Sequence, residues 1–242
     1  MELLIITSTV YVSSCFTVLT DPILRTEQYL DSIQFYLRSS ILKDVIVCDN
    51  SGYDYSKHPE LKQLADEQGK RLEILYFLGD KLNMEAKGKG YGEGEIMEYV
   101  QKNSLLLLNA RSFCKVTGRI RILNIDKLLK EINPTYPYFQ KMNFNPFVNQ
   151  KKVDTRFYHC TKDVFNKNLL YAYKAVNDTA TYYLENAYYD HLKQGRVVYK
   201  SYWHLPRFVG VSGSTGESYT VGKARWWKEK ILHAILKLYG LR

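Results

Sequence analysis

Residues 113–120 read Phe-Cys-Lys-Val-Thr-Gly-Arg-Ile, and they follow a strand-like apolar run at 105–108. We expect a buried strand that ends in a small-residue turn at Thr117, Gly118 and Arg119. Ligands of open α/β sheets bind outside the carboxyl ends of the strands, so this turn would aim donors at a phosphate. An ordinary turn with a solvated arginine is the alternative for this segment taken alone.

Upstream of this stretch, short apolar runs alternate with helical patterns. We expect strands at 3–6, 45–48 and 72–78, a helix capped by Asp21 that begins at Pro22, and a helix from Pro59 to Gly69. The first strand runs into Thr7 and Ser8, and the second runs into Asp49 and Asn50. The order predicts βαβ units with polar side chains at one edge of a sheet.

Residues 87–95 read Lys-Gly-Lys-Gly-Tyr-Gly-Glu-Gly-Glu, with four glycines in seven positions. We expect a glycine-rich loop that leads into a helix at 95–102 and brings backbone N–H groups to an anion. The pattern is neither a Walker A loop nor a G-x-G-x-x-G fingerprint. A surface loop without a ligand is the alternative.

The second half of the chain is expected to hold a short helix at 122–132, a loop at 134–146 and a strand at 152–158. Asp154 and Arg156 alternate along that strand and share one face, so they can pair with each other. Further helices are expected at 162–166 and at 178–192, with Glu185 in the middle of the latter, followed by a last strand at 197–199. Residues 206–219 hold three glycines and four hydroxyl residues and are expected to form a loop.

The tail at 223–242 has the pattern of a basic amphipathic helix. Trp227, Ile231, Ile235 and Leu238 fall on one helical face, and lysines and arginines lie mostly elsewhere. Such a helix fits an anchor on an anionic membrane surface, or packing on the domain or on a second subunit. We expect one catalytic domain at 1–222, with a nucleotide-binding half at 1–125 and an acceptor half at 126–222.

The composition narrows the possible partners. The chain has 242 residues and a formal net charge of +9, which favours an anionic partner. No nucleic-acid-binding motif is present, so a membrane surface or a phosphorylated small molecule is preferred to nucleic acid. Four widely spaced cysteines, no basic segment before the first apolar run, and no apolar run of roughly 20 residues favour a cytoplasmic protein, peripheral on the inner face of the membrane.

Taken together, these segments resemble the bacterial cell-surface polysaccharide glycosyltransferases of GT-A type, which build capsule, O-antigen or lipooligosaccharide. The resemblance rests on Thr7-Ser8 and on residues 47–51, 87–95, 115–119, 154–157, 184–186 and 210–216, and it extends to about residue 222. It implies a GT-A-like (Rossmann-like) mixed, mostly parallel sheet flanked by helices. It also implies transfer of a sugar from a nucleotide-sugar donor, with UDP the commonest nucleotide, to a saccharide or polyprenyl-diphosphate-linked acceptor.

One departure from the family pattern matters. GT-A enzymes usually carry an Asp-x-Asp that holds a divalent metal on the donor diphosphate, and here Thr117, Gly118 and Arg119 stand at that position. Arginine and lysine can neutralise a leaving diphosphate in place of a metal. We therefore expect a site without metal or other cofactor, in which Arg119, helped by Lys89 or Arg156, stabilises the diphosphate.

An inverting transfer also needs a carboxylate to deprotonate the acceptor. Glu185 is the first choice because its place in the chain matches that architecture, and Asp154 and Glu93 follow. A surface carboxylate paired with lysine is the alternative for Glu185. Donor-binding residues are expected in the loops at the sheet edge and in the 212–216 loop: Thr7, Ser8, Asp49, Asn50, Lys89, Gly90, Glu93, Lys115, Thr117, Gly118, Arg119, Arg156, Ser212, Gly213 and Ser214.

Two other functions remain open from the sequence. A nucleotidyltransferase would use the same sheet, although such enzymes carry a basic glycine-rich segment after the first strand, where this chain has Thr7-Ser8-Thr9. A non-catalytic binding subunit of polysaccharide assembly would bind no nucleotide sugar. Release of a nucleoside diphosphate rather than pyrophosphate separates the transferases.

Overall fold

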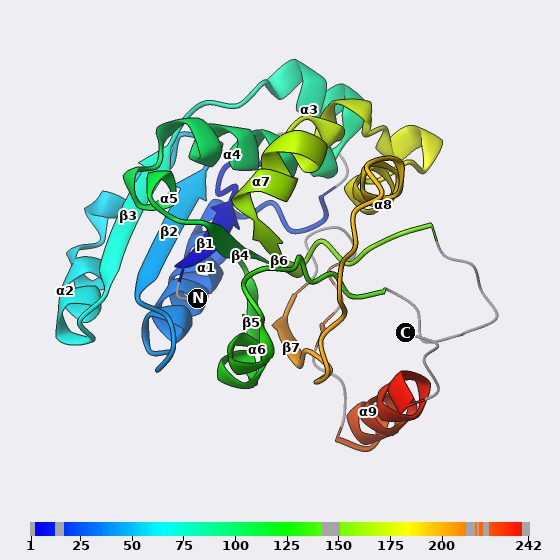
Figure 1. The fold of residues 1–242 in the computed structure, drawn as a ribbon. Coiled ribbons are helices and arrows are strands. Elements are labelled where there is room, and N and C mark those ends of the chain that lie inside the picture. The colour runs from blue at the N-terminus through cyan, green and yellow to red at the C-terminus, as the bar shows by residue number, and fades with distance from the viewer. Residues whose placement is uncertain are drawn as a thin grey trace.

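The computed structural model describes residues 3–12, 17–141, 151–211, 216, 218–219 and 223–238. A five-stranded sheet forms its centre, in the order β3 (Arg71–Tyr76), β2 (Asp44–Asp49), β1 (Leu3–Ser8), β4 (Ser112–Thr117) and β6 (Phe157–Thr161) (Figure 1). The first four of these pair in parallel, and β6 runs antiparallel to β4. The expected mixed, mostly parallel sheet is therefore confirmed.

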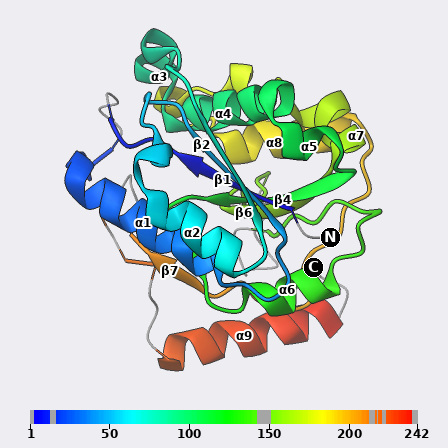
Figure 2. The same cartoon turned by 90° about the vertical axis from the view of Figure 1, so that its left-hand side faces the viewer.

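Helices cover both faces of the sheet (Figure 2). One face carries α1 (Pro22–Leu37), α2 (Pro59–Glu67) and α6 (Ile125–Glu131). The other face carries α3 (Lys81–Lys87), α4 (Lys89–Asn103), α5 (Leu105–Leu108), α7 (Lys162–Val164) and α8 (Leu184–Gln194). Because both faces are covered, β1 and β2 are nearly continuous apolar runs, as buried parallel strands require.

The smaller elements complete the chain. A two-stranded antiparallel sheet pairs β5 (Ile120–Ile122) with β7 (Phe208–Gly210), and α9 (Lys223–Leu238) is the last helix described. Short helical turns occupy Tyr55–Lys57, Phe165–Leu169, Ala172–Ala175 and Asp178–Ala180. Among the described residues, no helix combines the length and the apolar character needed to cross a bilayer.

The start of α1 follows the local sequence. Asp21 Oδ1 accepts hydrogen bonds from the amides of Ile23 (2.8 Å) and Leu24 (3.3 Å), and Pro22 is the first helical residue. Asp is a favoured N-cap, and proline fits the first helical position because that amide has no partner within the helix. The prediction of this helix start is confirmed.

The glycine-rich segment is helical, and the predicted loop is wrong. Gly88, at φ +102°, separates α3 from α4, which begins at Lys89. A Cβ on Gly94 would lie 2.0 Å from Cβ of Tyr173, and one on Gly90 would lie 3.1 Å from Cβ of Leu184. These glycines therefore let neighbouring elements approach α4 closely.

The apolar run at 105–108 is a helix rather than the predicted strand. Oγ of Ser104 accepts from the amide of Leu107 at 3.0 Å, and the Glu73 carboxylate accepts from the amides of Leu105 (2.8 Å) and Leu106 (3.1 Å). These contacts satisfy amides that a short helix leaves unpaired at its start. The buried strand that delivers Thr117 is β4 itself.

Three predicted elements lie elsewhere than expected. Residues 153 and 154 bond to Glu185 and Gln140 outside the sheet, so the strand predicted at 152–158 begins only at Phe157. Residues 197–199 form no strand. The next residue, Lys200, makes an isolated β-bridge with Tyr138, and its amide donates to the Pro137 carbonyl at 2.9 Å. The helix predicted at 178–192 begins at Leu184, after a left-handed residue, Thr181 (φ 58°), so Glu185 lies in its first turn.

Candidate active site

A cavity of about 320 Å³ opens at the carboxyl ends of β1 and β4. Its lining includes nine of the residues predicted from the sequence to form the site: Thr7, Ser8, Asn50, Lys89, Glu93, Thr117, Arg119, Arg156 and Glu185. Among the described residues, the lining carries four cationic side chains, those of Arg25, Lys89, Arg119 and Arg156, and two carboxylates, those of Glu93 and Glu185. This is the edge of the sheet at which ligands of open α/β folds bind.

Lys115 lies directly behind the cavity, with a fully buried side chain. Its Nζ donates to the Glu93 carboxylate, to Thr117 Oγ1 at 3.0 Å and to the Thr155 carbonyl at 2.8 Å. A buried ammonium is tolerated only when it is paired and hydrogen-bonded, and here three acceptors surround it. Lys115 therefore orients Glu93 and Thr117 from behind the cavity, and its predicted contact with a donor stays a prediction.

Glu185 reaches the same cavity from the first turn of α8. Its Oε1 accepts a hydrogen bond from Thr155 Oγ1 at 3.1 Å. Burial raises the pKa of the Glu185 carboxyl, and the neighbouring charge of Glu93 also raises it, whereas Lys89 acts in the opposite direction. A carboxylate with a raised pKa is a stronger proton acceptor than an exposed one, as a general base requires.

Arg119 is placed by the turn between β4 and β5. The amide of Gly118 donates to the Thr7 carbonyl at 3.0 Å, and a Cβ at this position would lie 2.2 Å from that oxygen. Only glycine allows this approach, which directs the next side chain to the cavity. The Arg119 guanidinium donates from Nη1 to Gln28 Oε1 at 3.0 Å and lies 5.8 Å from the Tyr29 ring centre.

Arg156 has more contacts with the protein than Arg119 has. Its guanidinium forms a two-pronged pair with Asp154, with Nε to Oδ1 at 3.0 Å and Nη2 to Oδ2 at 2.6 Å. The rings of Phe208 and Tyr219 lie 4.3 and 5.3 Å from it. The expected pairing of Asp154 with Arg156 is confirmed, and Asp154, which does not line the cavity, fixes the arginine at its wall.

Asp49 supports the rim of the cavity and is absent from its lining. Its buried carboxylate accepts from Ser8 Oγ (2.7 Å), from the amide of Val10 (3.0 Å), from the amide of Ser51 (2.7 Å) and from the amide of Tyr53 (3.1 Å). These contacts tie the segment after β1 to the segment after β2. Asp49 therefore organises the rim, and a ligand contact of its own stays a prediction.

Asn50, the next residue, faces the cavity. Its Oδ1 accepts from Thr9 Oγ1 at 2.6 Å, and its Nδ2 donates to the Gly92 carbonyl at 3.2 Å. It therefore joins the rim to α4. Gly90 packs against Leu184 and, like Gly118, does not line the cavity, while Ser212, Gly213 and Ser214 lie outside the described residues.

Arg25 and Tyr29 are among the lining residues that the sequence did not predict. Arg25 and Tyr29 lie one turn apart on α1, and both line the cavity. Nε of Arg25 donates to the Thr9 carbonyl at 3.0 Å and Nη1 to the Leu19 carbonyl at 2.8 Å, while the Tyr29 hydroxyl accepts from the amide of Thr9 at 3.0 Å. The sequence could have indicated Arg25, because it lies four residues before Tyr29 and eight before Ile33 and therefore shares their buried face of the helix.

Metal ligands do not gather in the described part of the chain, where no three His, Cys, Asp or Glu side chains are close enough together to hold an ion. The two carboxylates of the cavity already have protein donors, Lys115 for Glu93 and Thr155 for Glu185. Independence from metal stays a prediction.

No protein-family model matches the sequence, and neither does any curated protein. Among solved structures, the glycosyltransferase GlyE of Streptococcus pneumoniae TIGR4 is similar over 99% of this chain, with a TM-score of 0.53 and 9% identity. The chain spans 64% of the length of that structure.

A more distant likeness extends over 96% of this chain to 4-diphosphocytidyl-2C-methyl-D-erythritol synthase, at a TM-score of 0.43 and 9% identity, and covers 98% of that structure. The identity to GlyE is low enough that the likeness shows the fold alone. The chain therefore has the Rossmann-like mixed α/β fold found in a glycosyltransferase.

Proposed function

We propose that this protein is a glycosyltransferase that moves a sugar from a nucleotide-sugar donor to an acceptor hydroxyl. The observation that carries the proposal is the cavity at the carboxyl edge of β1 and β4, where Arg119 and Lys89 share one lining with Glu185. Such a transfer needs cations for the departing diphosphate and a carboxylate for the acceptor proton, and both are present.

The roles follow from the contacts. Arg119 and Lys89 would bind the diphosphate, and Arg119 is suited to it because a guanidinium can bond two phosphate oxygens at once. Arg156, aligned by Asp154, supplies positive charge at the wall. Glu185 takes the acceptor proton as the new glycosidic bond forms and the bond to the diphosphate breaks.

The finer identity of the substrates comes from the family resemblance. We propose a UDP-sugar donor, a saccharide or polyprenyl-diphosphate-linked acceptor, and a role in bacterial surface polysaccharide synthesis. Thr7, Ser8, Thr9 and Asn50, at the rim tied together by Asp49, are the candidates for the nucleoside.

Calorimetric titration with UDP-, GDP-, CMP- and dTDP-sugars tests the proposal. Binding of one donor class is expected, with slow release of the nucleoside diphosphate in the absence of acceptor. Arg119→Ala should reduce that release roughly 100-fold or more, since it removes a charge-stabilising donor, while the unfolding temperature stays near wild type. Binding of none of the four donors would contradict the proposal, and so would release of pyrophosphate when the protein is given a nucleoside triphosphate and a sugar phosphate instead.

Metal dependence is tested on the same reaction. Treatment with EDTA is expected to leave the rate unchanged, because Arg119 and Lys89 supply the charge. Loss of activity that Mn²⁺ or Mg²⁺ restores would show that an ion carries the diphosphate instead.

A further inference from the structure

The last helix described, α9, packs on the body of the protein along one side (Figure 2). His233 is buried there, and its Nε2 lies 3.2 Å from the Tyr202 carbonyl and 2.9 Å from the Trp203 carbonyl. Trp226 contacts Arg207 of the body, whose guanidinium lies 5.1 Å from the ring centre. These contacts fix which side of the helix faces outward.

The outward side is apolar. Trp227, Ile231, Ile235 and Leu238, which we call the apolar stripe, are spaced by four, four and three residues and are 53%, 57%, 43% and 74% exposed. Trp203, which contacts His233 through its backbone, is also 56% exposed. Single exposed apolar residues are ordinary, but a continuous stripe on one helix indicates an interaction surface.

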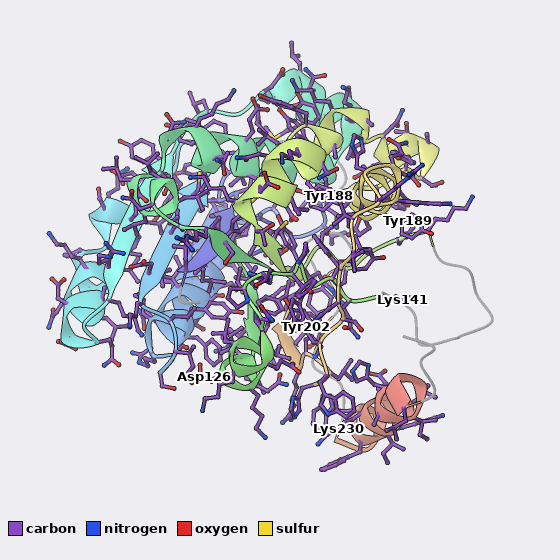
Figure 3. All side chains as sticks on the ribbon, viewed as in Figure 1. Asp126, Lys141, Tyr188, Tyr189, Tyr202 and Lys230 are labelled. Atoms are coloured by element: carbon purple, nitrogen blue, oxygen red, sulfur yellow. The ribbon has the colours of Figure 1, made fainter. Side chains whose placement is uncertain are left out.

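A second cavity, of about 700 Å³, lies between α9, α1 and α6, and we call it the basic cavity. Four cationic side chains line it: Arg38, Lys127, Arg207 and Lys230. Figure 3 labels Lys230 on α9 and Asp126 on α6, and both are lining residues. Nζ of Lys230 lies 4.4 Å from the ring centre of Trp227, so the basic cavity and the apolar stripe are adjacent.

Asp126 is the acidic side chain among the described lining residues. Its carboxylate accepts from Ser40 through the amide at 3.1 Å and the hydroxyl at 2.6 Å, and from the Ser39 hydroxyl. Its charge is therefore directed toward the loop after α1, and the cavity keeps an excess of positive charge.

We propose that the apolar stripe and the basic cavity together form a membrane-docking surface for anionic phospholipids. The stripe enters the boundary between headgroups and acyl chains, and the cations of the cavity bind lipid phosphates beside it. A second copy of the chain is disfavoured as the partner because each copy carries a formal net charge of +9. Nucleic acid is disfavoured because it has no acyl chains that could cover the apolar stripe. The inference is independent of the proposed sugar transfer.

The test uses the full-length protein with vesicles of phosphatidylcholine, with and without phosphatidylglycerol. Co-sedimentation is expected with the anionic vesicles only, together with a blue shift of tryptophan emission as Trp227 leaves water. Ile231→Glu should abolish binding, because it places a charge in the stripe. Leu82→Glu, at a leucine on α3 that is 79% exposed, is the matched control and should bind like wild type.

The basic cavity is tested by removing charge. Lys127→Ser and Arg38→Ser should each weaken binding roughly fivefold, while Lys62→Ser, at an exposed lysine of α2, should not. Equal binding to both kinds of vesicle, no binding to either, or full binding by Ile231→Glu would overturn the proposal. So would a concentration-dependent dimer that Ile231→Glu dissociates while vesicles capture nothing. Donor binding, measured without vesicles, reports separately on the sugar-transfer site.

Discussion

The position of Glu185 disfavours the ionised form of its side chain, because burial and the charge of Glu93 both raise its pKa. A raised pKa in the folded state means that this group stabilises the fold below the unfolded pKa, and that the contribution is lost as pH rises through the folded pKa. At neutral pH the ionised group therefore opposes folding. The proposed role of Glu185 as general base would account for a carboxylate in a position that lowers stability.

Glu185→Gln should lower kcat on the order of 100-fold or more while the unfolding temperature at neutral pH is unchanged or higher. In the wild type, the acid limb of the kcat/KM profile should lie above the ordinary glutamate range. Turnover assays across pH and thermal denaturation of the two proteins check this. A variant that loses stability and keeps its turnover would show that Glu185 is a structural partner of Thr155.

Lys115 differs from Glu185 in that the fold requires its charge. Lys115→Met should destabilise the protein by about 3–5 kcal/mol, because the Glu93 carboxylate loses its buried partner. Adding Glu93→Gln should recover most of that loss, which denaturant titration of the single and double variants measures. If the two losses simply add, the pair is not coupled in the way the geometry implies.

At the scale of elements, α4 contains glycines although glycine has a low helix propensity, because neighbouring side chains leave little room for a Cβ. Gly94→Ala should destabilise the protein by about 1–3 kcal/mol, although alanine favours a helix, because the new Cβ meets Tyr173. Donor affinity should change little. Lys102→Ala, at the exposed end of the same helix, is the control and should leave the stability close to that of the wild type. A loss of donor affinity at full stability would show that Gly94 acts on the candidate site rather than on the packing of α4 against Tyr173.

The elements also show what the sequence alone could predict. The start of α1 and strands β1 and β2 were predictable, because their signals are local: Asp21 with Pro22, and continuous apolar runs. The helix at 105–108 was not, since a four-residue apolar run has no readable period and its N-terminal partner, Glu73, is 32 residues away from Leu105. Arg119 was predicted from the end of a strand, whereas Lys89 was predicted from the glycine-rich segment and Glu185 from the family resemblance. Arg25, which was not predicted, reaches the cavity from a buried face of α1.

At the scale of the whole molecule, helices cover both faces of the sheet, and its edge strand β6 carries a buried histidine, His159. Burial lowers the pKa of His159 to about 4, and its Nδ1 lies 2.9 Å from the Tyr136 carbonyl. The unfolded chain takes up this proton near pH 6.5, so the stability is present above that pH and is lost as pH falls toward about 4.

The loss from this histidine should reach about 3 kcal/mol across that window. His159→Asn keeps a donor near the position of Nδ1 and removes the titration, so its stability should fall less steeply between the two pH values. Denaturant unfolding of both proteins at several pH values measures the two slopes. Identical slopes would place the acid sensitivity elsewhere in the chain.

The carboxylate of Asp49 has a consequence for the order in which the chain is made. All of the partners described for it lie between Ser8 and Tyr53, at sequence separations of 41 residues or fewer. The rim of the candidate site can therefore begin to form once β1, α1 and β2 have emerged from the ribosome, before the segments that carry Arg119 and Glu185 emerge. The contacts of Asp49 can then form before the elements that carry Arg119 and Glu185 are in place.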